Sequence, residues 1–288
     1  ETGDGGRVIV WSDEYTGFYG SISAQGAVDG LGGFVETSSK NNLQAFGDVI
    51  ATGGVDAGTW LLDPRNVEIT NLTQDGAFDA ADPNVFTPSA DNAKADVATI
   101  NASLSAGTSV VITTNDDGGA QAGNITFAGG SNILLDDGGV GGASKTPTIT
   151  FIAAGDFNST GATISAAGND RLSVVIGAAG SVTVGGAITT QGGDVTIQGS
   201  NASGSALAAN AGSVTVSATI DTTGSTGVAG GSIDIDSSGT VAINSNLVTS
   251  GGAEDGAGGF AGGDVTITTT GAGDTITIGA GADITTTG

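Results

Sequence analysis

The 288-residue sequence contains no cysteine, no histidine and no methionine. The absence of cysteine excludes disulfide bonds. Because histidine is missing too, the sequence also lacks Cys/His and Ser-His-Asp catalytic systems and zinc sites built from these ligands. Basic residues are few: six Lys and Arg stand against 30 Asp and Glu, for a formal net charge of −24. Such a surface repels nucleic-acid phosphates and anionic lipids, so we expect no nucleic-acid partner, and the charge favours solubility.

Long apolar runs are missing as well. No stretch approaches the roughly 20 apolar residues that span a bilayer, so we expect no membrane insertion. The chain opens with ETGDGG, which lacks the charged and apolar regions of a signal peptide. This start predicts a processed unit or a piece of a longer protein, without a secretion signal of its own.

Glycine is abundant, with 53 residues, and it opens a recurring phrase of glycine, any residue, then Val/Ile-x-Val/Ile. Three copies are evenly spaced, since the interval from Val195 to Val214 equals that from Val214 to Ile233. The next return, from Ile233 to Val265, is longer and holds an extra copy at 241–243. Short β-branched runs that return after glycine turns predict a β-solenoid, in which each coil buries its apolar row against its neighbours.

We therefore expect one elongated solenoid over residues 1–288, with Val, Ile, Leu and Phe inside and Thr, Ser, Asn and Asp outside. With about 20–26 residues per coil and about 4.8 Å between stacked strands, the rod should be around 60 Å long. Residues 74–99 lack the phrase and hold two of the four prolines, which predicts a loop insertion, with repetition resuming at residues 98–100. Residues 100–288 are predicted to form Gly/Thr-rich repeat coils.

Residues 1–73 are the richest in large side chains and hold both tryptophans and both tyrosines. The intervals from Val8 to Phe34 and from Phe34 to Trp60 are equal, and longer than those further along the chain, which predicts regular, longer coils here. Packing in the core or at a coil edge is the ordinary role for Trp11 and Trp60. Because aromatic faces also suit sugar rings, stacking on glycans is the functional alternative, with host or matrix glycans as partners.

The two ends of the sequence match each other. Residues 284–288 followed by residues 1–10 would read I-TTTG-ETGDGG-RVIV, and residues 220–235 read I-DTTG-STGVAGG-SIDI. Uncapped β-helix ends expose unpaired backbone groups. We therefore predict end-to-end self-association, either as a tandem array within a longer chain or as subunits that stack head to tail into a filament.

Four short sequence motifs in the first quarter of the chain carry a family resemblance: GGRVIVW at 5–11, FYGSISAQG at 18–26, GGFVETS at 32–38 and AGTWLLDPRNVEI at 57–69. Through these motifs, residues 5–69 resemble the filamentous-haemagglutinin-like exoproteins of Gram-negative bacteria and cyanobacteria. The resemblance implies a right-handed parallel β-helix, secretion by a two-partner route, and an adhesive or structural role outside the cell or at its surface. The family's N-terminal secretion domain, with its Asn-rich motifs, is not visible in this chain.

Parallel β-helices also host polysaccharide lyases and hydrolases. A lyase needs clustered basic side chains and a hydrolase needs converging carboxylates. Six scattered basic residues, and acidic pairs in glycine-rich corners, provide neither, so we expect no enzymatic activity and no cofactor. The rival hypothesis of a carbohydrate-active enzyme requires an acidic cleft, lined by insertion residues such as Asp75, Asp79 and Asp82.

Calcium is the one metal that the sequence leaves open, because it accepts oxygen ligands in flexible geometry. The candidates are Asp116 and Asp117 in one glycine-rich corner and Asp136 and Asp137 in another. The tandem nonapeptide of calcium-binding rolls is absent, so single ions are the form to expect.

Two further surface features are open to interpretation. Threonine-rich phrases near residues 266–270, 275–277 and 285–287 could form the hydroxyl ladders of an ice-binding solenoid, although threonine is also a common outward strand residue. Sequons for N-glycosylation, several of which arise by chance in such a composition, occur at Asn71, Asn101, Asn124, Asn158 and Asn201.

Overall fold

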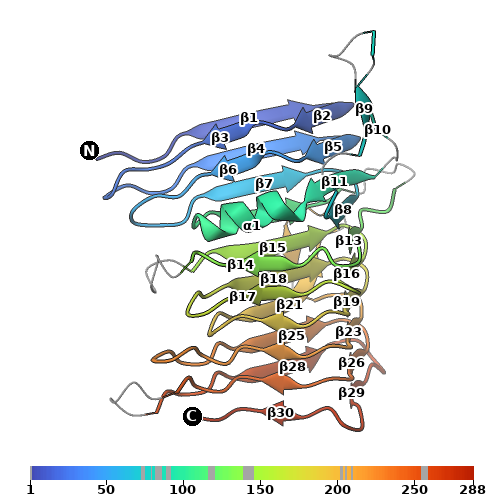
Figure 1. Ribbon diagram of the computed structural model, residues 1–288. Helices are drawn as coiled ribbons and strands as arrows, with labels where there is room; N and C mark the ends of the chain where they lie inside the picture. Colours follow the sequence, from blue (N-terminus) through green and yellow to red (C-terminus); the bar gives the residue numbers. More distant parts are fainter. Residues whose placement is uncertain are drawn as a thin grey trace.

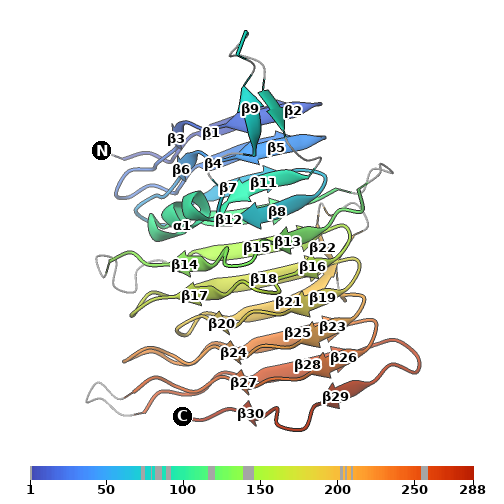
Figure 2. The same ribbon diagram turned by 45° about the vertical axis from the view of Figure 1, so that its right-hand side comes forward.

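The computed structural model is a parallel β-helix, which confirms the predicted solenoid (Figures 1 and 2). It describes residues 2–72, 75–78, 80–81, 86–88, 92–115, 121–138, 146–201, 204, 206–208, 210–253 and 259–288. The coils stack from the N-terminal strands to the C-terminal strands along one axis and form three walls, one of which is interrupted by a helix. Within the described residues no helix is long and apolar enough to cross a membrane.

The first wall stacks β1 (Arg7–Ser12), β4 (Phe34–Ser39), β7 (Thr59–Asp63), β12 (Ser109–Thr113), β15 (Thr148–Ala153), β18 (Ser173–Ala178), β21 (Val195–Ser200), β25 (Ile233–Ser237) and β28 (Val265–Thr269). A short strand, β22 (Leu207–Ala208), pairs antiparallel with β21. The second wall stacks β2 (Tyr15–Phe18), β5 (Asn42–Ala45), β11 (Ala93–Asp96), β8 (Val67–Thr70), β13 (Ile125–Phe127), β16 (Phe157–Asn158), β19 (Val182–Val184), β23 (Val214–Val216), β26 (Val241–Ile243) and β29 (Ile276–Ile278).

The third wall is built in two pieces with a helix between them. It begins with β3 (Ser21–Ser23) and β6 (Asp48–Ile50), continues past α1 (Val97–Ser105), and ends with β14 (Ile133–Leu135), β17 (Ile164–Ala166), β20 (Ile188–Thr189), β24 (Ile220–Asp221), β27 (Leu247–Val248) and β30 (Ile284–Thr285). Strand alternation turns every second residue inward, and the inward Val, Ile, Leu and Phe form one continuous core. Phe127, Phe151 and Phe157 pack together in it, with ring centroids 5.1–5.9 Å apart.

The recurring glycine phrase marks the corner before a strand, and it occurs on two walls of the same coil. A Cβ on Gly231 would lie 2.1 Å from the Gly193 carbonyl oxygen, and one on Gly239 would lie 2.0 Å from that of Gly212, so both corners require glycine. Gly193 and Gly231 precede first-wall strands, whereas Gly212 and Gly239 precede second-wall strands. The regular interval therefore separates a first-wall strand from a second-wall strand, and one full coil holds two such intervals.

The expected coil length and rod length are corrected by the strand register. Val195 pairs with Ile233 on the first wall, while Val214, midway between them in the sequence, lies on the second wall. Coils also differ in length, because the chain between the paired residues Val174 and Val195 is much shorter than that between Val110 and Ile149. With fewer and longer coils than expected, the first-wall stack spans roughly 40 Å at about 4.8 Å per strand, not 60 Å.

The prediction that the first two coils have equal lengths is wrong, because Phe34 is not the residue that pairs with Val8 and Trp60. Val8 pairs with Val35, and Val35 pairs with Trp60, so the first step is longer than the second. A shift of one residue in the register of a strand moves each side chain to the opposite face of the sheet. Val35 therefore points into the core, and Phe34 points outward, where the Arg7 guanidinium lies 5.0 Å from its ring centroid.

The predicted insertion at residues 74–99 contains an excursion, but its last residues belong to the walls. The antiparallel strands β9 (Gly76–Phe78) and β10 (Phe86–Pro88) stand beside the N-terminal end of the second wall (Figure 2). The chain then returns as β11, which pairs in parallel with both β5 and β8. It enters the second wall out of sequence order, between two strands that precede it in the chain.

The expected strand at residues 98–100 is instead part of α1, a correction with a clear physical cause. Asp96 caps the helix through its carboxylate, which accepts from the Ala98 N–H (3.2 Å), and Gly107 ends it with a φ of 79°. Ser103 donates to the Val49 carbonyl of β6 (2.9 Å), and Asn101 accepts from the Leu134 N–H of β14 (2.9 Å). Polar side chains of the helix thus bond to the facing edges of both pieces of the third wall.

Asn and Asp side chains link successive coils at the corners. The Asn66 side-chain oxygen accepts from the Asn124 N–H (2.7 Å), that of Asn124 accepts from the Asp156 N–H (2.8 Å), and that of Asp156 accepts from the Ser181 N–H (2.7 Å). Each oxygen satisfies a backbone donor that no strand partner reaches. Part of the high Asp and Asn content is therefore structural.

Several threonines are buried rather than outward-facing, and three of them repeat one role in successive coils. Thr190, Thr222 and Thr249 are fully buried, and their hydroxyls donate to the carbonyls that open the next first-wall corner, 2.5–2.6 Å away at residues 193, 231 and 263. We predict that Thr222→Val lowers the free energy of unfolding by about 1–3 kcal/mol, because the buried carbonyl loses a donor. Urea unfolding measures this. The control Thr215→Val changes an outward residue of β23 and should stay within about 0.5 kcal/mol of the wild type; an equal loss in both variants would contradict the role of the bond.

Candidate ligand-binding site

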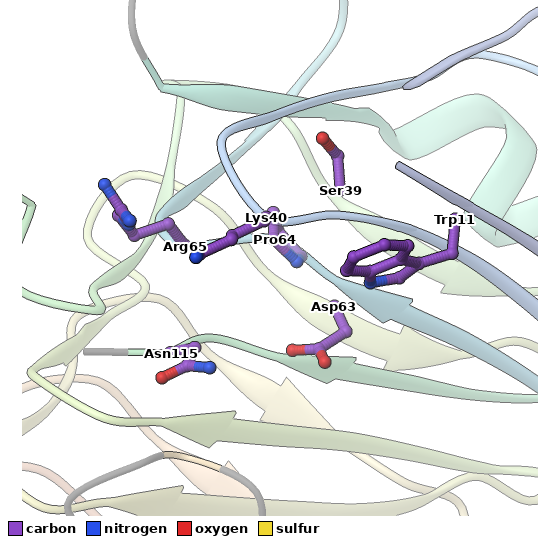
Figure 3. A pocket seen from close by; sticks show the side chains of 7 residues that line it. All are labelled: Trp11, Ser39, Lys40, Asp63, Pro64, Arg65 and Asn115. Carbon is purple, nitrogen blue, oxygen red and sulfur yellow. The ribbon is translucent and has the colours of Figure 1, made fainter. Parts of the chain in front are cut away.

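A pocket of about 300 Å³ lies where four successive first-wall strands turn toward the second wall (Figure 3). It forms at the C-terminal ends of β1, β4, β7 and β12, so the coil stack itself brings together residues that are far apart in the sequence. Its lining residues are Trp11, Ser39, Lys40, Asp63, Pro64, Arg65 and Asn115.

The side chains in the pocket differ in chemistry. The Trp11 indole flanks the hollow on one side, the Asp63 carboxylate projects into its middle, and Arg65 and Asn115 lie opposite the indole (Figure 3). Trp11 is 54% exposed. The Asn115 N–H donates to the Arg65 carbonyl (3.3 Å), which ties the two loops together. An aromatic face, two cations and several hydrogen-bonding groups therefore line one cavity.

Asp63 is held in place from behind. Its carboxylate accepts from the Thr113 hydroxyl (2.7 Å) on the neighbouring strand β12. Burial raises the pKa of Asp63 above its usual value, the Thr113 hydrogen bond lowers it, and the nearby Glu36 carboxylate raises it further, for a net upward direction. A carboxyl group fixed in this way can orient a hydroxyl-bearing ligand.

The two tryptophans differ in burial, which bears on whether each packs in the core or could stack on a glycan. Trp60 is fully buried, its indole N–H donates to the Thr37 hydroxyl (2.9 Å), and its ring meets Phe18 edge to face at 6.3 Å between centroids. Glycan stacking is therefore ruled out for Trp60, which is a core residue. Trp11 keeps the exposed face that stacking requires.

The expectation that basic residues are scattered is also corrected, because two of the six, Lys40 and Arg65, line the same pocket. Sequence reasoning did not select these residues, nor Asp63 or Asn115. A signal was present, since each lies at or directly after the end of a first-wall strand. Using it requires knowing which strands share a wall.

The calcium candidates receive no support from the described residues. Asp136 and Asp137 lie in a turn beside Asp170, whose carboxylate accepts from the Asp137 N–H (2.9 Å). Burial, and then the Asp137 and Asp136 charges, raise the pKa of Asp170 although the hydrogen bond from the Asp137 backbone lowers it. No group of three or more metal-ligating side chains occurs among the residues that the structure describes. Asp116 and Asp117 lie outside those residues.

The acidic cleft required by the enzyme hypothesis is not found at Asp75. Its side chain is 10% exposed and lies 3.7 Å from the Lys94 ammonium, which also contacts Glu68. Lys94 is 9% exposed, so the three charges form a largely buried group on the outer face of β8 and β11. Asp79 and Asp82 lie outside the described residues.

The five sequons differ in accessibility. Asn71 and Asn158 are exposed, and Asn124 and Asn201 are partly buried. The Asn101 side-chain amide is engaged at both ends, accepting from Leu134 and donating to the Asn132 carbonyl (3.1 Å). A glycan on Asn101 would break that link between α1 and β14, so Asn71 and Asn158 are the sequons best placed for modification.

The threonine phrases divide among the walls instead of forming one face. Thr266 lies on the first wall, Thr277 on the second and Thr285 on the third. The outward column of the second wall runs through Thr126, Asn158, Thr183, Thr215, Ala242 and Thr277. The column is interrupted twice, which weighs against a regular ice-binding ladder.

Comparison with known proteins gives no further assignment: no protein-family model matches the sequence, and no curated protein matches it significantly.

Proposed function

We propose that this chain forms a stiff extracellular shaft whose units join end to end, as a segment of a surface adhesin or as the subunit of an extracellular filament. The observation that carries the proposal is the state of the outermost coil. The inward residues Ile276, Ile278 and Ile284 of β29 and β30 are 43–44% exposed, whereas the residues they stack on, such as Val241 and Leu247, are buried.

The edges of this coil lack two of the devices that prevent strand pairing, namely charged side chains and proline. β28, β29 and β30 contain no charged residue and no proline, which are the usual means of protecting an exposed strand edge. The opposite end of the stack presents β1, β2 and β3, one strand on each of the same three walls. Every wall therefore has a possible partner wall in the next unit. That unit is either a second copy of the protein or a further segment of the same polypeptide.

The inward rows are also compatible across such a junction. Val265 and Ile267 on β28 would stack on Val8 and Val10 on β1, because both pairs occupy the same inward positions of the first wall. The similar sequence patterns at the two ends of the chain support the same junction. The resemblance of residues 5–69 to filamentous-haemagglutinin-like exoproteins supports the location outside the cell, and the buried state of Asp75 favours a structural role over catalysis.

The test is electron microscopy and sedimentation of the purified protein over a concentration series. We expect rods that lengthen with concentration, with an axial repeat of roughly 45 Å from the stacked strands. The double substitution Ile276→Lys/Ile278→Lys places two charges in the junction and should leave short rods only.

Thr277→Lys is the matched control, because it puts a lysine on the outward face of the same strand. It should assemble nearly as the wild type does. Short rods of a single size for the wild type at every concentration would argue against association between copies, and equal assembly of all three proteins would show that the β29 edge is not the junction.

A further inference from the structure

We infer that the pocket lined by Trp11, Lys40, Asp63 and Arg65 binds a carboxylate-bearing sugar, such as a hexuronate unit of an acidic polysaccharide. This inference is independent of the shaft proposal, because it rests on the pocket alone.

The first argument is the placement of positive charge. The chain has six basic residues and a net charge of −24, yet Lys40 and Arg65 come from successive coils into one cavity. The pocket also contains the Asp63 carboxylate, so its two cations outnumber one acidic side chain. An anionic ligand complements that excess, and the planar guanidinium of Arg65 matches the two oxygens of a carboxylate.

The second argument is the aromatic wall. Trp11 exposes its indole at the rim of the pocket (Figure 3), whereas Trp60 is buried in the core. An exposed indole offers an apolar face to the C–H groups of a sugar ring while the ring hydroxyls stay hydrogen-bonded. The indole and the two cations lie on different sides of the hollow (Figure 3).

The third argument is the set of groups suited to hydroxyls. Asp63, fixed by Thr113, supplies acceptors in the middle of the pocket, and the Asn115 amide supplies an acceptor and donors on the side of Arg65. A cavity of about 300 Å³ has room for one or two sugar rings. Stacking selects a ring, the cations select an acid, and Asp63 with Asn115 orients the hydroxyls, which together favour an acidic sugar over a simple carboxylate or a neutral sugar.

Tryptophan fluorescence tests the inference directly, because the chain has only two tryptophans and Trp60 is buried. The probes are digalacturonate, the neutral disaccharide galactobiose, and sodium acetate at equal ionic strength. We expect a saturable change in Trp11 emission with digalacturonate, and no saturation with the other two at the same concentrations.

Variants then separate stacking from charge. Trp11→Ala removes the optical reporter, so its affinity is measured by calorimetry, and we expect binding weakened about tenfold, the loss of one aromatic contact. Lys40→Gln/Arg65→Gln should weaken binding at least about tenfold, the loss of charge-assisted hydrogen bonds, while leaving the weak response to galactobiose unchanged. The control Arg171→Gln changes a basic residue at a different corner, before β18, and should bind as the wild type does.

Several outcomes would overturn the inference. One is the absence of any saturable response to digalacturonate. Another is an equal response to galactobiose, which would make the site neutral-sugar-binding. A third is an equal affinity for acetate, which would reduce the site to a carboxylate contact. Retention of full affinity in the Lys40→Gln/Arg65→Gln variant would overturn the assigned role of the cations.

Discussion

Replacement of Trp60 by alanine is expected to lower the free energy of unfolding by about 3–5 kcal/mol, the usual cost of emptying the space of a large aromatic side chain in a core. The indole is fully buried in the first wall, with its N–H bonded to Thr37 and its ring against Phe18. Neighbouring coils are fixed by backbone pairing on both sides of β7, so they have little freedom to close the cavity. Urea unfolding followed by circular dichroism measures the loss.

Trp11→Ala is the matched control, because it removes the same side chain from an exposed position. It should change the free energy of unfolding by less than about 1 kcal/mol, since little packing is lost at the surface. Similar losses in the two variants would contradict the different environments assigned to the two tryptophans.

Replacement of Lys94 by methionine is expected to cost about 3 kcal/mol or more, because it leaves two carboxylates without their shared cation. Glu68 and Asp75 both contact the Lys94 ammonium, and the Lys94 and Asp75 side chains are at most 10% exposed. The loss should be local at first, with faster amide exchange and proteolysis around β9, β11 and the start of α1.

A rescue experiment separates charge from packing at this group. Adding Glu68→Gln and Asp75→Asn to Lys94→Met removes both negative charges and should restore much of the lost stability. Lys40→Met, at an exposed site, should have little effect on unfolding. If the triple variant is no more stable than Lys94→Met alone, the ion pairs do not account for the loss.

The sequence predicts the class of fold well because the solenoid signal is local. Alternating Val and Ile after glycine corners recur along the C-terminal half of the chain, and the strands found at 182–184, 195–200, 214–216 and 233–237 follow that pattern. The coil length could not be predicted, because the same phrase precedes strands on two walls. An even spacing between phrases is therefore compatible with one short coil per phrase or with a long coil that holds two.

The other errors have equally specific causes. Val97, Thr99 and Ile100 are β-branched and favour a strand, but the caps at Asp96 and Gly107 and the gap between β6 and β14 select a helix. The pocket could not be predicted from the sequence for a different reason. Its lining residues come from four separate strand ends spread over more than a third of the chain, and only the register of those strands shows that they share a corner.

The position of β11 has a consequence for the order in which the chain can fold. β5 and β8 do not pair with each other, because β11 lies between them, and β11 follows β8 only after the excursion that holds β9 and β10. A vectorial mechanism, in which each turn of the solenoid is completed before the next is added, therefore fails at this level. The second wall must wait there for residues 93–96, so the segment from β5 to β13 should fold as one cooperative block. In a chain emerging from its N-terminus, this wall would stay incomplete at that level until β11 arrives.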